Sequence, residues 1–533
     1  MKKDQIFAGI GFSLIGLCFI LSLSRMFQRI SEESDPKLTT IRFSHWQLES
    51  GIREGFDAVA QEYMRLHPNV RVIQEPVPEK IYTNWIITQL VGETAPDLVL
   101  LGGVTDERLA RYFVPITPYV NQSNPYNQGT DLEKLPWRET YLDGMEGAYN
   151  PNLLEYYSAP FAMHVIRLFY NKELLKKISG RDDLPTDYDA FLQLCHQIQD
   201  YAQKSGEVVI PIAGSKYNSA IMVGRFFSTQ TQRMVDRPSM GYLLRPDVEI
   251  LTPRYWENEW SLNDPEIRSG LEMMHEIGLH MQPGFMQLQR EDATFYFVQQ
   301  RAVMIASGSW DRSSVRTETQ GRFTVGVCAL PSPSPASPRF GKYVLGPVSE
   351  ASTKAFGGFG IPRSSKSFDV ALDFERFLCS RIGNQIFVNR SGWLPAIAGV
   401  KIPEELKAFE PQLNGYPEGF ALQWSPNVKR VVENELNQLY QVTGGVDRFI
   451  SALKPKYAEA LAEDSRNNIR GLLRNTFRME TAFGALLELQ KQDPHDSHLE
   501  NKIAEMNENM VMAESHWMRG QYDLRQAGYN TKP

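Results

Sequence analysis

The sequence predicts an α/β protein of at least two domains, with an apolar N-terminal segment and a helical C-terminal tail. Three observations support this prediction. The chain of 533 residues exceeds the ~100–200 residues of an ordinary single domain. After residue 38, apolar strand patterns alternate with amphipathic helix patterns, which is typical of a parallel sheet. From about residue 457, strand patterns cease and apolar residues recur at helical spacing.

The N-terminal apolar segment follows two lysines in MKKDQ and runs over Ile6–Leu23. As a helix it is about 27 Å long at ~1.5 Å per residue, which is the short limit for crossing a bilayer. A cleaved signal peptide and an uncleaved anchor both fit this pattern. Because Arg25 directly follows the small residues that a cleavage site needs, we expect an anchor helix over 1–27 and a linker over 28–37. The positive charges before the segment place the rest of the chain outside the cytoplasm.

The first domain opens with three strands and two helices in alternation. We expect a strand at Ile41–Ser44, a helix at about 50–67, a second strand after Pro68, a helix at Ile81–Val91 and a third strand in APDLVLLGG. In parallel sheets, ligands collect at the carboxyl ends of the strands. The sequence therefore places three candidate residues at this edge, namely His45, Trp46 and Asp97.

Composition excludes several classes of protein. The formal charge of −7 and the pI of about 5.8 argue against a nucleic-acid binder. The four cysteines are far apart and form no CxxC pair, so we expect buried thiols rather than a zinc or redox site. Metal-ligating and phosphate-loop motifs are missing. Ser451 and Lys454 match a serine-x-x-lysine pattern, but the SDN and KTG elements of such nucleophile sites do not accompany it, and we expect no cofactor, no metal and no catalysis. A polysaccharide-active enzyme remains an alternative, because sequence cannot say which of 63 acidic residues meet.

The opening and three later segments follow one another in the same order as in a known family. The later segments are FYNKELLKK at 169–177, FVQQRAVMIASGSW at 297–310, and the stretch from FGGFGIP to GWLPA at 356–396. Together with the opening they cover about residues 40–440. In this order they are similar to extracellular solute-binding proteins of ATP-driven importers, the maltose-binding-protein-like family, whose members bind mostly sugars and oligosaccharides.

The resemblance implies a periplasmic-binding-protein-like fold of type II, in which two α/β lobes close over a ligand. We expect the first lobe at 38–165 and 308–362, and the second at 166–307 and 363–455. A C-terminal helical extension would occupy 456–533. The chain would then cross between lobes near residues 165, 307 and 362.

Sugars present C–H faces between hydroxyl edges, so aromatic platforms are the natural candidates for their site. Trp310 is the first candidate, because it stands on the turn after the apolar strand 302–306, and we expect it on the first lobe. The family pattern also implies contacts near His45, Trp46, Asp97 and Trp393. Gly358, which would let the backbone approach a ligand, and Trp424 complete the set of expected ligand-binding residues. For each tryptophan the alternative is ordinary packing, for Asp97 it is a local cap of the Gly102–Gly103 turn, and for Gly358 it is a permissive turn.

The resemblance implies the substrate-binding component of an ATP-driven importer. It would capture a carbohydrate at the outer face of the cytoplasmic membrane, remain anchored by its N-terminal helix, and deliver the ligand to permease subunits. Nucleic acid is not an expected partner. The alternative function is a membrane-anchored sensor that presents its closed form to a receptor. The sequence leaves open which sugar is bound, and also whether a polyamine or peptide takes its place.

The tail carries two apolar series at heptad spacing. The first comprises Ile469, Leu472, Thr476, Met479, Phe483 and Leu486, and the second comprises Leu499, Ile503, Met506, Met510, Ala513 and Trp517. They flank Asp493–Pro494, so the sequence predicts a helical hairpin. Two roles stay open for it: packing back on the second lobe, or docking to another molecule.

Overall fold

The computed structural model describes residues 38–49, 51–150, 153–234, 248–350, 353, 355–419 and 421–530. The chain divides into two compact units, the first Met1–Ala162 with Lys354–Lys401 and the second Met163–Thr353 with Ile402–Pro533. The expected anchor and linker at 1–37 lie outside the described residues. Within the described ranges, no helix has both the length and the apolar character needed to cross a membrane.

The first unit is built on a six-stranded sheet in the order β12-β6-β11-β3-β1-β2. Its strands are β1 (Thr39–His45), β2 (Val70–Pro76), β3 (Leu98–Leu100), β6 (Ala159–Met163), β11 (Phe356–Gly360) and β12 (Leu394–Pro395). β1 pairs in parallel with β2 and β3, which confirms the parallel arrangement predicted for the opening. β11 runs antiparallel to β3 and β6, so the sheet as a whole is mixed.

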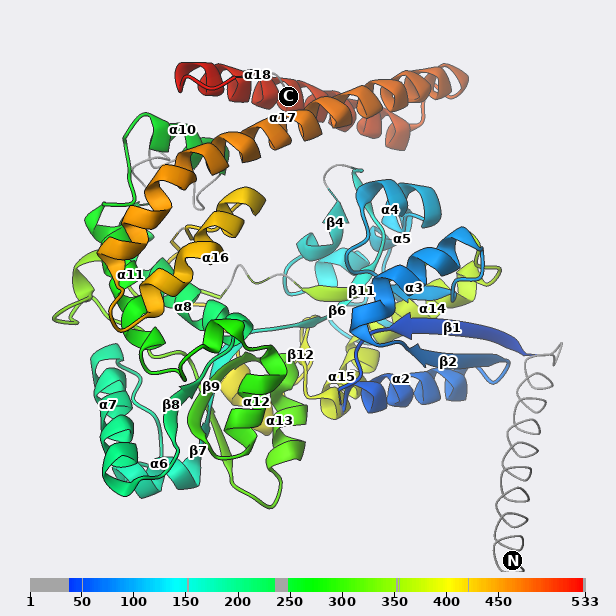
Figure 1. Cartoon of the computed structure of the whole chain (residues 1–533). Helices are drawn as coiled ribbons and strands as arrows, with labels where there is room; N and C mark the ends of the chain where they lie inside the picture. Colours follow the sequence, from blue (N-terminus) through cyan, green and yellow to red (C-terminus); the bar gives the residue numbers. More distant parts are fainter. Residues whose placement is uncertain are drawn as a thin grey trace, which may run out of the picture. The chain divides into compact units, whose positions relative to one another are not determined.

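The helices of the first unit are α2 (Ile52–Leu66), α3 (Glu79–Val91), α4 (Asp106–Tyr112), α5 (Thr117–Val120), α14 (Phe368–Leu378) and α15 (Arg381–Ser391). A short hairpin of β4 (Tyr149–Asn150) and β5 (Glu155–Tyr156) accompanies them. α2 buries its apolar stripe and packs against α15 (Figure 1). Phe56 of α2 contacts Phe43, Phe161, Phe359 and Phe387, so one aromatic cluster joins the helices to the sheet.

The second unit contains a four-stranded sheet in the order β10-β7-β9-β8. Its strands are β7 (Ile166–Asn171), β8 (Ile210–Ala213), β9 (Ala302–Gly308) and β10 (Val325–Cys328). β8 and β9 are parallel, whereas β7 runs antiparallel to both β9 and β10. All seven residues of β9 are buried, as expected for an apolar run in the centre of a covered sheet.

Ten helices of the second unit surround this sheet or extend from it among the described residues. They are α6 (Lys172–Ser179), α7 (Tyr188–Ser205), α8 (Lys216–Gln230), α10 (Val248–Trp256), α11 (Pro265–Gly278), α12 (Arg290–Val298), α13 (Arg312–Thr319), α16 (Pro426–Tyr440), α17 (Val446–Gln492) and α18 (Ser497–Gln526). Across both units, the thiols of Cys195 and Cys379 are free and buried and that of Cys328 is free and half-buried, in line with the expected unpaired thiols.

Two segments lie in the opposite unit from the one that we expected from the sequence. Residues 308–353 are part of the second unit rather than the first, because β10 pairs with β7. Residues 363–401 are part of the first unit rather than the second, because α15 packs on α2 and β12 extends the first sheet. The three connections between units accordingly fall after residues 162, 353 and 401, and not near 165, 307 and 362.

A buried ion pair in the second unit holds together the three chain segments that lie next to the connections. The Arg167 guanidinium donates to both carboxylate oxygens of Glu350, at 2.8 and 3.0 Å. Arg167 also donates to the carbonyl oxygens of Ala408 and Glu410, and the Gln412 backbone N–H donates to Glu350. Arg167 follows the first connection, Glu350 precedes the second, and residues 408–412 follow the third. These hydrogen bonds therefore join the second-unit ends of all three connections.

The C-terminal hairpin is confirmed, with α17 and α18 lying side by side (Figure 1). α17 begins at Val446, ahead of the expected start at 456, because Phe449 and Leu453 are already buried in the core of the second unit. The residues of the two predicted series are buried or half-buried. Packing on the second unit is therefore one role of the hairpin, through α16 and α11 for α17 and through α10 for α18.

Candidate functional site

Trp46 marks the carboxyl edge of the first sheet. It directly follows β1 and is half-buried, with its ring 5.0 Å from the Tyr82 ring at an interplanar angle of 67°. A Cβ at Gly102 would lie 2.3 Å from the indole, so only glycine leaves room for this ring. The Tyr82 hydroxyl hydrogen-bonds to the carbonyl oxygens of Ser44 and Leu100, both at 3.1 Å. The Trp46 ring is thus held against the ends of β1 and β3.

His45, the neighbour of Trp46, belongs to the core and not to this edge. Its side chain is fully buried, 4.9 Å from the Phe56 ring, and its Nε2 is 2.8 Å from the Gln74 side-chain oxygen. Burial lowers the pKa of His45 to about 4, so the imidazole is neutral at ordinary pH. A ligand contact from this side chain is therefore excluded in the described conformation.

Asp97 lies at the opposite edge from the one expected. It precedes β3, which starts only at Leu98, so it stands at the amino end of that strand. Its carboxylate accepts hydrogen bonds from the Arg42 backbone N–H at 2.9 Å and from the Ser365 hydroxyl at 2.7 Å. These contacts with residues distant in the chain give it a structural role, and among the described residues it is not seen to cap the Gly102–Gly103 turn, which was the alternative left open by the sequence.

Trp393 and Gly358 are also packing residues of the first unit. Trp393 is only 3% exposed and lies against Phe161 and Phe356, with ring centroids 6.1 and 5.2 Å away. Gly358 pairs with Pro160 inside the sheet, and a Cβ there would lie 2.5 Å from the Ser158 hydroxyl oxygen. Close approach of neighbouring chain, and not of a ligand, accounts for this glycine.

Trp310 stands at the carboxyl edge of the second sheet, in the short 3₁₀ turn Ser309–Asp311 after β9. It therefore lies in the second unit, whereas the sequence led us to expect it on the first lobe. Its half-buried indole lies over Gly308, where a Cβ would be 2.2 Å away, and its ring is 5.3 Å from that of His164. The bulky residue fits on a turn because the strand beneath it ends in glycine.

A second aromatic residue and a charged pair lie at the same edge of the sheet as Trp310. Tyr217, in the first turn of α8, is 40% exposed, and the Arg290 guanidinium lies 5.7 Å from its ring centroid. Arg290 forms an ion pair with Asp311, which also accepts a hydrogen bond from the Ser307 hydroxyl. Two aromatic residues, a cation and a carboxylate therefore lie along the end of one sheet.

The topology explains why these residues meet. β8 and β9 are parallel, so Tyr217 after β8 and Trp310 after β9 emerge at the same edge. β7 runs antiparallel to β9 and pairs Ile166 with Gly308, so His164 before β7 reaches that edge too. Burial lowers the pKa of His164.

Sequence reasoning missed Tyr217, Arg290 and His164. A signal for Tyr217 was present, since the strand IPIA is followed by Ser215, whose hydroxyl accepts from the Asn218 backbone N–H and caps α8. No sequence signal marks Arg290, because its position depends on how α12 packs beside β9.

Trp424 lies apart from these residues. It is half-buried against Trp260 and Tyr457, with ring centroids 5.5 and 6.2 Å away, at the border of the second unit's hydrophobic core. Packing is the role that these contacts show. In the part of the chain that the structure describes, no group of three or more His, Cys, Asp or Glu residues is arranged to hold a metal ion.

Comparison with known proteins places this geometry in a family. The sequence profile described as bacterial extracellular solute-binding protein matches residues 58–410, and no curated protein matches the chain.

Several solved structures share the fold at low identity. The GacH receptor of Streptomyces glaucescens is 15% identical with a TM-score of 0.54, and the match covers 79% of this chain and 98% of that one. RafE from Streptococcus pneumoniae is 15% identical (TM-score 0.52, covering 80% and 100%), and maltose-bound T. maritima MalE3 is 16% identical (0.52, covering 79% and 98%). The fold is thus the two-lobe, periplasmic-binding-protein-like α/β fold, and the chain belongs to the bacterial extracellular solute-binding protein family.

Proposed function

We propose that this protein captures an extracytoplasmic sugar or oligosaccharide and delivers it to the permease subunits of an ATP-driven importer. The observation that carries this proposal is the arrangement at the end of the second sheet. There the half-buried Trp310 lies over Gly308, and Tyr217, Arg290 and Asp311 lie at the same edge of the sheet. The solved relatives support the ligand class, since GacH was described with acarbose and MalE3 with maltose.

The chemistry of this edge suits a carbohydrate. An indole and a phenol offer flat apolar faces to the C–H side of a pyranose ring. Arg290 offers donors to its hydroxyl groups, and the ion pair with the buried Asp311 keeps the guanidinium oriented before a ligand arrives. Binding requires neither a cofactor nor bond cleavage, so the proposal is a binding protein and not an enzyme.

Delivery to a membrane partner is the remaining part of the proposal. Membership of the extracellular solute-binding family supports a location outside the cytoplasm. The apolar segment Ile6–Leu23 behind two lysines supports attachment to the outer face of the cytoplasmic membrane by an uncleaved helix.

A second candidate is a sensor that presents its closed form to a membrane receptor. The C-terminal hairpin favours it, because α18 exposes apolar side chains outside its seam with α17. Among them, Val511 is 59%, Met518 55% and Tyr522 60% exposed. A surface of this kind is typical of contact with another protein.

Thermal unfolding of the full-length protein tests the ligand class. The panel comprises maltose, raffinose, acarbose and xylobiose, with spermidine and a tripeptide as alternatives. A ligand at a hundredfold excess over its Kd stabilises the folded state by about 2.7 kcal/mol. A rise in Tm with a sugar supports the proposal, and a rise only with spermidine or the tripeptide contradicts it.

A further inference from the structure

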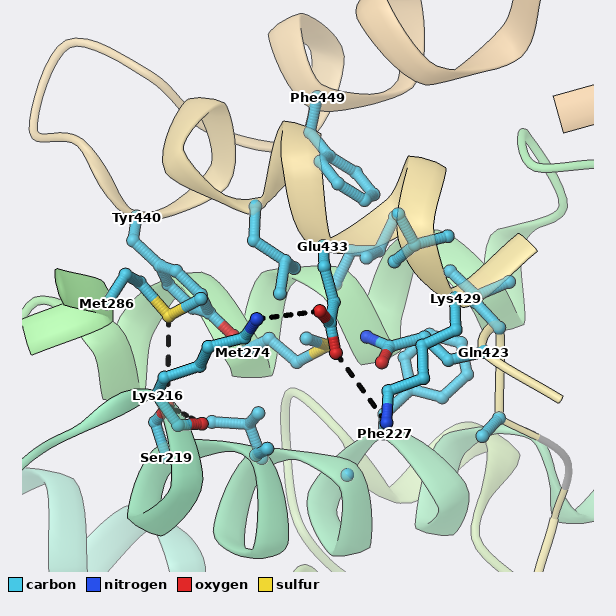
Figure 2. A pocket seen from close by; sticks show the side chains of 18 residues that line it. Lys216, Ser219, Phe227, Met274, Met286, Gln423, Lys429, Glu433, Tyr440 and Phe449 are labelled. Atoms are coloured by element: carbon cyan, nitrogen blue, oxygen red, sulfur yellow. Dashed lines mark hydrogen bonds and ion pairs between the residues drawn. The ribbon is translucent and has the colours of Figure 1, made fainter. Parts of the chain in front are cut away.

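The second unit contains a cavity separate from the Trp310 edge. Its volume is about 280 Å³, and it lies between α8, α11, α16, the start of α17 and the loop 421–423 (Figure 2). None of His164, Tyr217, Arg290 and Trp310 is among the residues that line it.

The walls of the cavity are mainly apolar. α8 contributes one face of its helix, and α11, α16 and α17 close the opposite side. The apolar side chains are Ala220, Val223, Phe227, Leu271, Met274, Met286, Ala421, Leu422, Val432, Leu436, Tyr440 and Phe449. A polar molecule placed among them would lose hydrogen bonds to water without replacement, so the body of an occupant must be apolar.

Gly224 keeps the α8 wall open. It lies inside the helix, where glycine is about 1 kcal/mol less favourable than alanine. A Cβ built on Gly224 meets no atom within 4 Å, so the space in front of it is empty. A glycine that weakens its helix and borders empty space is the arrangement expected where room for an occupant is retained.

The rim of the cavity carries an excess of positive charge. Lys216 Nζ lies 2.8 Å from one carboxylate oxygen of Glu433, and Lys429 Nζ lies 3.8 Å from the other (Figure 2). Two ammonium groups thus share one carboxylate, and the Lys429 ammonium is beyond direct hydrogen-bond distance. The Gln423 side chain also faces this space and makes no hydrogen bond within the described part of the chain.

We propose that this cavity binds a small amphipathic molecule, with an apolar alkyl or aryl body inside and a carboxylate at the rim held by Lys429 and Gln423. At ~30 Å³ per water molecule the cavity has room for about nine waters, so the occupant has about nine or ten non-hydrogen atoms. Octanoate, with ten non-hydrogen atoms, and 3-phenylpropionate, with eleven, are close to this size. The site is independent of the sugar site proposed above.

Isothermal titration of the full-length protein with octanoate and 3-phenylpropionate tests this inference. Gly224→Leu places a side chain into the empty space without a clash at its Cβ, and we expect it to abolish binding. Gly484→Leu is the matched control, because Gly484 also lies inside a helix with nothing within 4 Å, outside the cavity. Binding by this control variant should equal that of the unmodified protein.

A second pair of measurements tests the carboxylate. Lys429→Gln should weaken octanoate binding about tenfold and leave the weaker binding of 1-octanol unchanged. The inference is overturned if neither acid binds, if Gly224→Leu binds them as tightly as Gly484→Leu, or if octanol and octanoate bind equally well. Sugar-induced stabilisation in Gly224→Leu reports separately on the proposed sugar site.

Discussion

The two units of this protein treat the aromatic residues at their strand ends in different ways. In the first unit, His45 and Trp393 turn into the core, and only Trp46 stays at the carboxyl edge. In the second, Trp310 stays at the edge in company with Tyr217 and a charged pair. Both edge tryptophans lie on a glycine, Gly102 or Gly308, with no room for a Cβ. In both units, the tryptophan after a strand stays at the edge where a neighbouring glycine makes space for its ring.

The two units also differ in the charge state of their buried carboxyl groups. Burial raises the pKa of Glu350 in the second unit, but the hydrogen bonds and charge of Arg167 outweigh it and the net shift is downward. Glu375 in the first unit has no cation of this kind, and burial raises its pKa to about 8. One unit therefore buries a charged pair and the other a carboxyl group that is mainly neutral at pH 7.

The largest expected effect comes from breaking the charged pair. Arg167→Met leaves the Glu350 carboxylate buried and removes the donors to Ala408 and Glu410, so we expect a loss of about 3–5 kcal/mol in the free energy of unfolding. Urea denaturation measures it. Arg225→Gln is the control, since Arg225 is more exposed and contacts Glu350 only at 3.2 Å, and it should cost less. Equal losses for both variants would show that Arg167 is not the main partner that keeps the buried Glu350 carboxylate charged.

The next largest effect is the difference in stability loss between replacing a core tryptophan and replacing an edge tryptophan of the first unit. Trp393→Ala removes a buried ring from the cluster around Phe161 and should cost about 3–5 kcal/mol of stability. Trp46→Ala removes a half-buried ring and should cost less than half as much. Denaturant midpoints of the two variants test this order. A larger loss for Trp46→Ala would make Trp46 the structural residue and reverse the assignment.

A smaller effect concerns pH. Because the folded-state pKa of Glu375 is raised, the folded protein holds a proton that the unfolded chain releases, and this carboxyl destabilises the fold as pH rises from about 4.5 to 8. Glu375→Gln should therefore gain stability relative to the unmodified protein over that window and match it most closely near pH 4. Tm values of both proteins across this range provide the test. A constant difference at every pH would show that Glu375 does not titrate there.

The opening of the fold was readable from sequence because its signals are local. The apolar periods around Phe56 and Leu98 identified α2 and β3, and heptad spacing identified the hairpin. The allocation of 308–353 and 363–401 to the units was wrong, because it depends on pairings between strands distant in the chain, such as β10 with β7. No local pattern marks those partners.

The site was predicted only in part for a similar reason. Trp46 and Trp310 follow strands that end at the carboxyl edge, and strand order predicts that position. The expected position of Asp97 was wrong, because Asp97 precedes β3 and therefore stands at the amino end of that strand and not at its carboxyl end. Arg290 reaches Tyr217 through the packing of α12, and this depends on tertiary structure that residue spacing does not reveal.

The central claim is that the Trp310 edge binds a sugar. Titration calorimetry of the full-length protein and Trp310→Ala with maltose, raffinose, acarbose and xylobiose tests it most directly, with Trp424→Phe as a tryptophan control away from that edge. We predict that at least one sugar binds the unmodified protein and Trp424→Phe alike, and that Trp310→Ala weakens it by about tenfold or more. A sugar that binds Trp310→Ala as tightly as the unmodified protein would contradict the account.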